Sequence, residues 1–211
     1  MKFKTLLVIA IAAALPLQSA PAQGFPNPLQ YMDSEIKKFY EILGERDPKD
    51  PQSVKSTRQK LRVELYSVFD KGRISALALG REMRTFSDDQ FARFSDQFAN
   101  LLFLTYLEKI ESYNGEKFTF DSFTDPDNSK TIVTGRVVTS SNEIPFEYHL
   151  FLENGVWKLF NIKVEGISLI QNYRTQFREY LINHSPDELT ERVKEKADEL
   201  DKSINQKLLN Q

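Results

Sequence analysis

Apolar positions recur along most of the chain at the three- and four-residue spacing of an amphipathic helix. This spacing predicts helices over six segments, 28–44, 51–69, 74–79, 87–112, 167–181 and 186–208. Helix-start signals support these boundaries, because Asn27, Asp50, Ser87 and Ser185 are all residues that cap helix N-termini. A proline follows three of these caps, and the spacing of Ser87 and Gln90 is that of a capping box. The helix boundaries are therefore well marked by local chemistry.

The fourth of these helices differs from the others in its middle. Residues 99–107 are apolar on almost every side, with no polar stripe that would face water. A helix without a polar, solvent-facing side is buried on all sides. We expect this segment to lie at the centre of the fold, with a sheet on one side and other helices on the opposite side.

Between the fourth and fifth helices the spacing of apolar residues changes to alternation, which is typical of strands. The predicted strands are 117–123, 131–139, 144–152 and 156–164. Asn154-Gly155, between the last two, is a strong signal for a tight hairpin turn. Four sequential strands with short turns predict an antiparallel meander. The expected fold is therefore α+β, with a four-stranded sheet and about six or seven helices; the family resemblance given below implies that the sheet is twisted and wrapped by the helices.

The N-terminus has the three parts of a secretory signal peptide. Lys2 and Lys4 precede an apolar stretch at 6–17, and small residues follow at 20–22. That stretch is shorter than the roughly 20 residues that a membrane-spanning helix needs. We expect residues 1–22 to be removed and residues 23–211 to form one exported domain. In a bacterium with two membranes this domain would be periplasmic.

Composition excludes several classes of function. The 28 basic and 30 acidic residues give a net charge of −2, which becomes −4 once Lys2 and Lys4 are removed. Nucleic acid is therefore not an expected partner, since no basic excess is available for a phosphate backbone. The chain has no cysteine, which excludes disulfides and thiolate metal sites. With 40% hydrophobic residues it has enough apolar side chains for a folded core.

The sequence also lacks the motifs of common catalytic sites. It contains no G-x-S-x-G turn and no glycine-rich phosphate loop. Its two histidines, His149 and His184, have no partner at metal-ligand spacing. We expect no catalytic residue, no metal and no cofactor, so the residues by elimination favour a binding protein. Two alternatives stay open: an exported chaperone or interaction module, and a cone-shaped enzyme that acts on an apolar small molecule.

Several stretches resemble one family. The matching positions are Asn27, Pro28, Met32, Asp33, Phe69, Asp70, Leu79, Gly80, Gln90, Phe91, Phe94, Phe98, Leu101, Leu102, Thr105, Tyr106 and the segment 157–177. Their pattern is similar to that of the MlaC family, also called the toluene-tolerance family. The resemblance extends from about residue 27 to 183, and 165–177 is its most specific part. Two positions depart from the family pattern: Asn161 replaces the usual Asp, and Met83 replaces a frequent Trp.

The resemblance implies a periplasmic phospholipid-binding protein of an ABC-transport system that maintains the lipid asymmetry of the outer membrane. It implies a deep apolar cavity between the sheet and the helices, which holds acyl tails and leaves the headgroup near solvent. It implies exchange of lipid with an outer-membrane lipoprotein–porin complex and with an inner-membrane complex that carries MCE-domain rings. We expect the carrier itself to be a monomer.

Apolar residues of the long helix, the sheet and the fifth helix are the candidates for the cavity lining. They are Phe94, Phe98, Leu101, Leu102, Tyr106, Phe118, Phe120, Val133, Phe146, Tyr148, Leu150, Leu159, Ile162, Ile167, Ile170, Tyr173 and Phe177. The same residues would also suit an ordinary close-packed core, since large cavities are disfavoured. The sequence therefore leaves two readings of this set, a lipid cavity and a solid interior.

Overall fold

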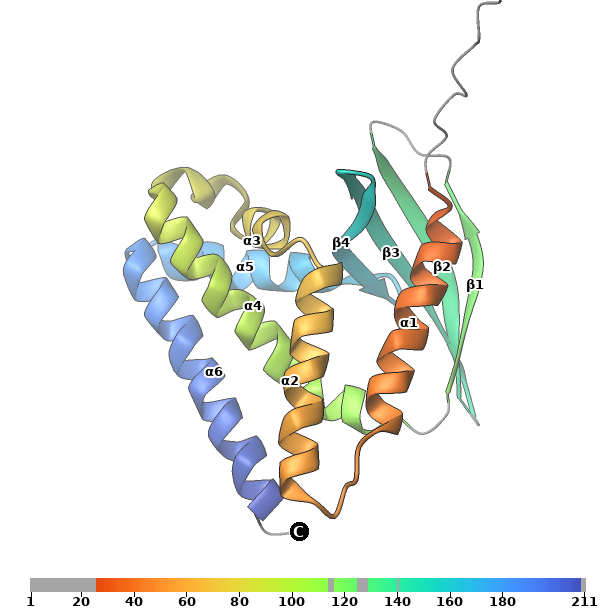
Figure 1. Cartoon of the computed structure of the whole chain (residues 1–211). Coiled ribbons are helices and arrows are strands. Elements are labelled where there is room, and N and C mark those ends of the chain that lie inside the picture. Colours follow the sequence, from red (N-terminus) through yellow and green to blue (C-terminus); the bar gives the residue numbers. More distant parts are fainter. Residues whose placement is uncertain (1–25, 114–115, 125–128, 140, 210–211) are drawn as a thin grey trace, which may run out of the picture.

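A computed structural model of the chain describes residues 26–113, 116–124, 129–139 and 141–209 (Figure 1). The expected signal peptide, residues 1–22, lies outside the described residues. The elements are α1 Pro28–Gly44, α2 Pro51–Val68, α3 Lys71–Leu79, a 3-10 helix Gly80–Thr85, α4 Asp88–Glu111, β1 Lys117–Phe123, β2 Lys130–Val138, β3 Glu143–Glu153, β4 Val156–Val164, β5 Ile167–Ser168, α5 Leu169–Leu181 and α6 Pro186–Leu209. They form two layers, a sheet crossed by α1 and a layer of the other helices. The predicted α+β class is confirmed.

The helices begin where their caps predict. The Asn27 side chain accepts hydrogen bonds from the backbone N–H groups of the first turn of α1, and Asp50 does the same for α2. Ser87 and Gln90 form a reciprocal capping box at the start of α4. Each cap satisfies backbone donors that the first turn leaves without partners inside the helix. Local side-chain chemistry therefore sets these boundaries.

The sheet is an antiparallel meander in the order β1-β2-β3-β4-β5. The turn between β3 and β4 has positive φ at both Asn154 (50°) and Gly155 (79°), as a type I′ hairpin requires. The sheet has five strands instead of the predicted four. The fifth, β5, has only two residues and follows a turn with positive φ at Glu165 and Gly166. A strand of this length shows no alternation, so the sequence pattern could not reveal it.

An irregularity in β4 decides which of its side chains face inward. Leu159 pairs with Leu150 and Asn161 pairs with His149, so Phe160 is an extra residue between the two pairs. A bulge of this kind shifts the alternation of a strand by one position. Leu159 and Ile162 therefore both pack against the inner face of the sheet, although they are three residues apart.

In the middle of α4, Leu101–Leu104 and Leu107 are buried as predicted, but Thr105 is exposed, so this segment is not buried all round. The expectation that a sheet covers one side of it is wrong. The main neighbours of α4 are α2, α3 and α6. The reason is that α1 lies across β1 and β2 and occupies the inner face of the sheet there.

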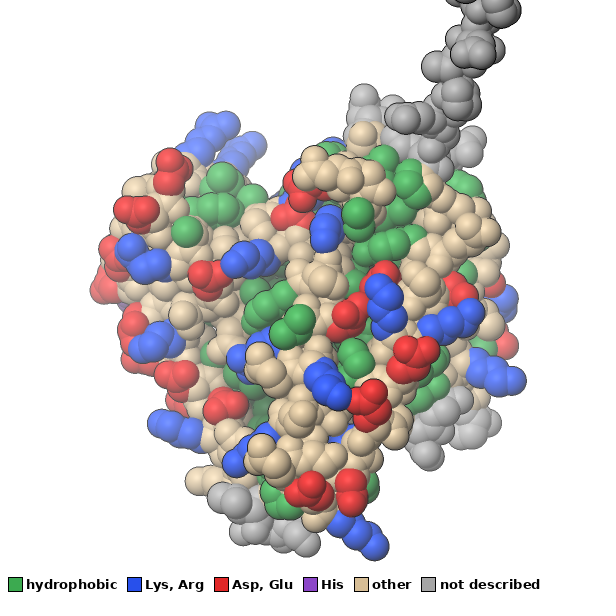
Figure 2. Space-filling view, viewed as in Figure 1, with side chains coloured by type: hydrophobic (Ala, Val, Ile, Leu, Met, Phe, Trp, Pro, Cys, Tyr) green, Lys and Arg blue, Asp and Glu red, His purple; other side chains and the backbone are tan. Residues whose placement is uncertain are grey.

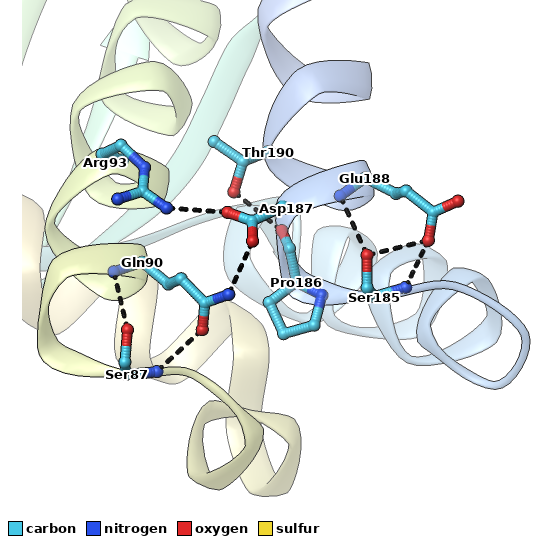
Figure 3. Close-up of polar contacts among 8 residues, drawn as sticks. All are labelled: Ser87, Gln90, Arg93, Ser185, Pro186, Asp187, Glu188 and Thr190. Carbon is cyan, nitrogen blue, oxygen red and sulfur yellow. Dashed lines mark hydrogen bonds and ion pairs between the residues drawn. The ribbon is translucent and has the colours of Figure 1, made fainter.

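The starts of α4 and α6 are joined by a polar network (Figure 3). Asp187, in the first turn of α6, accepts hydrogen bonds from Gln90 Nε2 and Arg93 Nη2 of α4, each at 2.7 Å. Ser185 and Glu188 form the capping box of α6 itself. Since Gln90 also belongs to the capping box of α4, this network ties the two helix N-termini together.

Asp187 makes this joint dependent on pH. Its hydrogen bonds from Gln90 and Arg93 lower the pKa of the Asp187 carboxyl. A lowered pKa stabilises the folded chain above the ordinary value of about 3.9, and the stabilisation is lost as the pH falls through the lowered value. We expect Asp187→Asn to lower the urea midpoint at pH 7, and its difference from the wild type to shrink below about pH 4. Asp198→Asn, an exposed change on the same helix, is the control, and equal loss in both variants would contradict the prediction.

Candidate functional site

Most candidate lining residues lie in two apolar clusters. The helical cluster contains buried side chains of α4 and α5, with two tyrosines packed against it: Phe94, Phe98, Leu101, Leu102, Ile170, Phe177, Tyr106 and Tyr173. The sheet cluster contains buried and half-buried side chains of the inner sheet face: Val133, Leu150, Leu159, Phe120, Tyr148 and Ile162. The helical cluster lies mainly on the helices and the sheet cluster mainly on the sheet, and the two meet at side chains that pack against both.

Four aromatic rings extend the sheet cluster along β1 and β3. Phe146 stacks on Tyr148 with ring centroids 4.4 Å apart, and it contacts Phe118 and Phe120 at 5.8 Å each. Gly135 pairs with Phe146 from β2, and a Cβ at Gly135 would lie 2.5 Å from the Phe146 ring. The absence of a side chain at Gly135 therefore allows this ring to lie flat on the sheet.

Phe39 of α1 and Phe69, at the end of α2, each pack against both clusters. Phe69 also joins the layers through the backbone, because it pairs with Leu159 at the edge of β4 and Asp70 N–H donates to Leu159 O at 3.0 Å. Sequence reasoning missed both phenylalanines as site residues. Helical spacing placed Phe39 on an apolar face, but it could not show that this face touches two clusters.

Tyr148 indicates internal space between the clusters. Burial raises the pKa of the Tyr148 phenol well above its usual range, so the side chain lies deep in the protein. The residue nevertheless keeps accessible surface, as do its partners Phe120 and Ile162. A side chain that is both deep and partly accessible borders space that solvent can reach. The inner sheet face around Tyr148 is therefore not sealed from solvent.

Tyrosine hydroxyls supply polar groups on the helical side of the same interface. Burial raises the pKa of both Tyr106 and Tyr173. Tyr173 has the Thr105 hydroxyl within hydrogen-bonding reach, and its ring meets Phe98 edge-on at 4.9 Å. The helical side of the interface thus combines aromatic rings with a few neutral hydroxyl groups, a composition found in sites for largely apolar ligands.

Ile167 joins neither cluster, and its side chain is the one exposed side chain among the candidates. Its side chain is 72% exposed. Ile167 pairs with Val164 across the turn at Glu165 and Gly166, and the positive φ of both turn residues reverses the chain at the end of the sheet. The expectation that Ile167 lines an interior is therefore not met, because the sequence pattern did not reveal this turn and strand.

Asn161 has a neutral partner at the position where the family pattern has Asp. Its Oδ1 accepts a hydrogen bond from Ser168 Oγ at 2.9 Å, and Ser168 is also the N-cap of α5. An amide oxygen serves this bond as well as a carboxylate oxygen does. The substitution therefore keeps the link between β4 and the start of α5.

Two hollows stand out in the described part of the chain, and neither of these two is the enclosed cavity expected between the layers. One, of about 320 Å³, lies at the ends of α2, α4 and α6 with Arg46, Arg58 and Lys207 among its lining. The other, of about 370 Å³, lies against β2 and β3 and is lined by Arg136 and Phe146 among others. In the space-filling view a notch separates the helical layer from the sheet layer at the upper edge (Figure 2).

The described residues show neither a metal site nor a membrane span. No group of three or more His, Cys, Asp or Glu side chains among them is placed to hold a metal ion. No helix among them is both long and apolar enough to cross a membrane.

Comparison with known proteins agrees with this architecture. The chain is 25% identical over 183 residues to the toluene tolerance protein ttg2D of Pseudomonas putida, a match that covers 85% of this chain and 83% of that protein. Its fold matches that of a phospholipid-binding protein from Ralstonia solanacearum, solved in complex with a phospholipid, with a TM-score of 0.71 and 18% identity. That match covers 83% of this chain and 99% of the other. The family model of the MlaC protein matches residues 33–195, so this chain belongs to the MlaC family.

Proposed function

We propose that this protein is an exported carrier that binds phospholipid and holds its acyl tails between the helical cluster and the sheet cluster. The observation that carries the proposal is the deep but partly accessible inner face around Tyr148, in a chain that belongs to the MlaC family. The complex of the Ralstonia solanacearum protein with a phospholipid supports it, because that protein has the same fold. The proposed lining is the set of candidate residues without Ile167.

The energetics explain why such a carrier needs an apolar interior. Exposing the roughly 30 methylenes of a diacyl lipid to water costs on the order of 24 kcal/mol, at about 0.8 kcal/mol each. A lipid therefore does not cross an aqueous gap at a useful rate without cover. The carrier must bind tails about as well as a bilayer does, because a much tighter site would prevent delivery. Aromatic and aliphatic walls with few polar groups provide affinity of this kind.

The proposed cellular role is a shuttle in the periplasm, as the family resemblance implies. In this role the carrier exchanges lipid with an outer-membrane lipoprotein–porin complex and with an inner-membrane ABC complex that carries MCE-domain rings, and so maintains the lipid asymmetry of the outer membrane. The proposal describes a binding and transport protein and assigns no enzymatic step to it.

Native mass spectrometry of the mature chain tests the binding proposal. We expect the protein, purified from a bacterial periplasm, to carry additional mass equal to about one phospholipid. Extraction with organic solvent and refolding should remove this mass, and incubation with phosphatidylethanolamine vesicles should restore it. A chain that carries no lipid on isolation and takes up none from vesicles would contradict the proposed function.

A further inference from the structure

An ionisable cluster lies where α1 meets α2. Glu35 of α1 has only 7% of its side chain exposed, and Glu64 of α2 has 20%. Lys38 Nζ lies 2.9 Å from Glu35 Oε1 and 3.6 Å from Glu64 Oε1. Two carboxylates in this seam therefore face one ammonium group, and the lysine side chain is itself half exposed.

Glu64 has a weaker charged partner than Glu35. Its Oε1 is buried, makes no hydrogen bond among the described residues and lies 3.6 Å from Lys38 Nζ, against 2.9 Å for Glu35 Oε1. Desolvation and the neighbouring Glu35 carboxyl raise the pKa of Glu64, and Lys38 only partly offsets this rise. One shared proton would turn the repulsion between the two carboxylates into a hydrogen bond across the seam.

Other charged groups near the seam come mainly from α1. Tyr31 lies close enough to Glu35 and Glu64 that both, together with burial, raise the pKa of its phenol. Two other elements contact α2, but at helical turns other than that of Glu64. Lys158 of β4 donates a hydrogen bond to Ser67 O, and Glu111 of α4 forms an ion pair with Arg58. Among the described residues, none of these side chains is bonded to Glu64. The balance at the seam therefore depends on Glu35, Glu64 and Lys38.

Because this ionisable cluster lies between α1 and α2, its charge affects how firmly the two layers are held together. α1 lies across β1 and β2, whereas α2 packs on α4 and, at its C-terminal end, also contacts β4. Phe39, one helical turn after Glu35, packs against both apolar clusters. On the proposed function, acyl tails lie between the clusters, and separation of the layers would widen the way in. The α1–α2 seam is one of the places where the layers are joined.

We propose that Glu64 takes up a proton beside the buried Glu35 and, with Lys38, forms a pH-dependent latch that holds α1 against α2. The closed seam binds this proton more tightly than the open seam does. Closure is therefore favoured below the ordinary glutamate pKa, and this advantage is lost as the pH rises through the raised pKa of Glu64. Each unit by which the closed form raises that pKa changes the ratio of open to closed protein by about tenfold.

Distance measurement between the layers tests the latch without any lipid. The chain has no cysteine, so spin labels at Gln30→Cys on α1 and Lys202→Cys on α6, both exposed, would be the only two. We expect a narrow distance distribution at pH 5 and an additional longer population at pH 8. In the Glu64→Gln background, where an amide donates to Glu35 at every pH, the short distance should persist at pH 8. Asp33→Asn removes an exposed carboxylate from α1 and should behave like the wild type.

Two results would overturn the latch: a wild-type distribution that does not change between pH 5 and pH 8, or a Glu64→Gln protein that opens with pH as the wild type does. Glu35→Gln gives a second test if Glu64→Gln fails to fold, because the amide then donates in the opposite direction. The consequence for lipid rests on the proposed function, and uptake of a fluorescent phospholipid should be faster at pH 8 than at pH 5. A chain that opens with pH but takes up no lipid would support the latch and contradict the proposed function.

Discussion

Replacement of Ile162 by glutamate is expected to abolish lipid retention, whereas the same replacement at Ile167 is expected to leave it unchanged. Ile162 is half-buried on the inner sheet face and pairs with Tyr148, beside the proposed tails. Ile167 is 72% exposed at the end of the sheet. A carboxylate beside the tails must lose its water at a cost of several kcal/mol, which lowers affinity by more than about a hundredfold. The exposed carboxylate at Ile167 keeps its water.

Native mass spectrometry of the two variants measures this difference as the fraction of protein that carries phospholipid. Circular dichroism must show that both variants are folded. If Ile162→Glu is not folded, Ile162→Trp adds bulk without charge and should also reduce the lipid-bound fraction. Full lipid occupancy in a folded Ile162→Glu protein would remove this part of the sheet from the proposed site. Loss of lipid in Ile167→Glu would show that the outer turn takes part in binding.

Addition of a single methyl group at Gly135 is expected to destabilise the sheet strongly. A Cβ at this position would lie 2.3 Å from Thr119 O and 2.5 Å from the Phe146 ring. Neither the backbone of β1 nor a ring stacked on Tyr148 can move away without breaking other contacts. We expect Gly135→Ala to lower the free energy of unfolding in urea by about 2–3 kcal/mol, near the upper end for overpacked sites.

Gly44→Ala is the matched control for this change. Gly44 ends α1, and a Cβ there would meet nothing within 4 Å. Since alanine favours a helix more than glycine does, this control should leave stability unchanged or raise it by up to about 1 kcal/mol. A Gly135→Ala protein as stable as Gly44→Ala would show that the Phe146 ring is free to move, and the aromatic row would then not be a rigid wall.

Sequence patterns predicted the elements of this fold well and their neighbours poorly. Asn27, Asp50 and Ser87 marked helix starts correctly, because a cap acts on backbone groups within three residues of itself. Asn154-Gly155 marked its hairpin for the same reason. The surroundings of α4 were predicted wrongly, since an apolar helix surface shows that it is covered but not by which element.

The candidate site shows the same division. Alternation along β3 identified Phe146 and Tyr148 as inward-facing, and both lie on the inner face. The placement of Ile167 was wrong, because it depends on a turn with positive φ at Glu165 and Gly166 and on a strand of two residues. Periodicity carries no information about an element that is shorter than one period.

The sequence alone determined where most helices and strands begin and end, which of their faces are apolar, and which family the chain resembles. The first two depend on residues that are close along the chain. Only the tertiary structure decided that Phe39 and Phe69 touch both clusters, that Phe146 lies over Gly135, and that Glu35 meets Glu64. These contacts join residues far apart in sequence, and packing of whole elements against one another selects them.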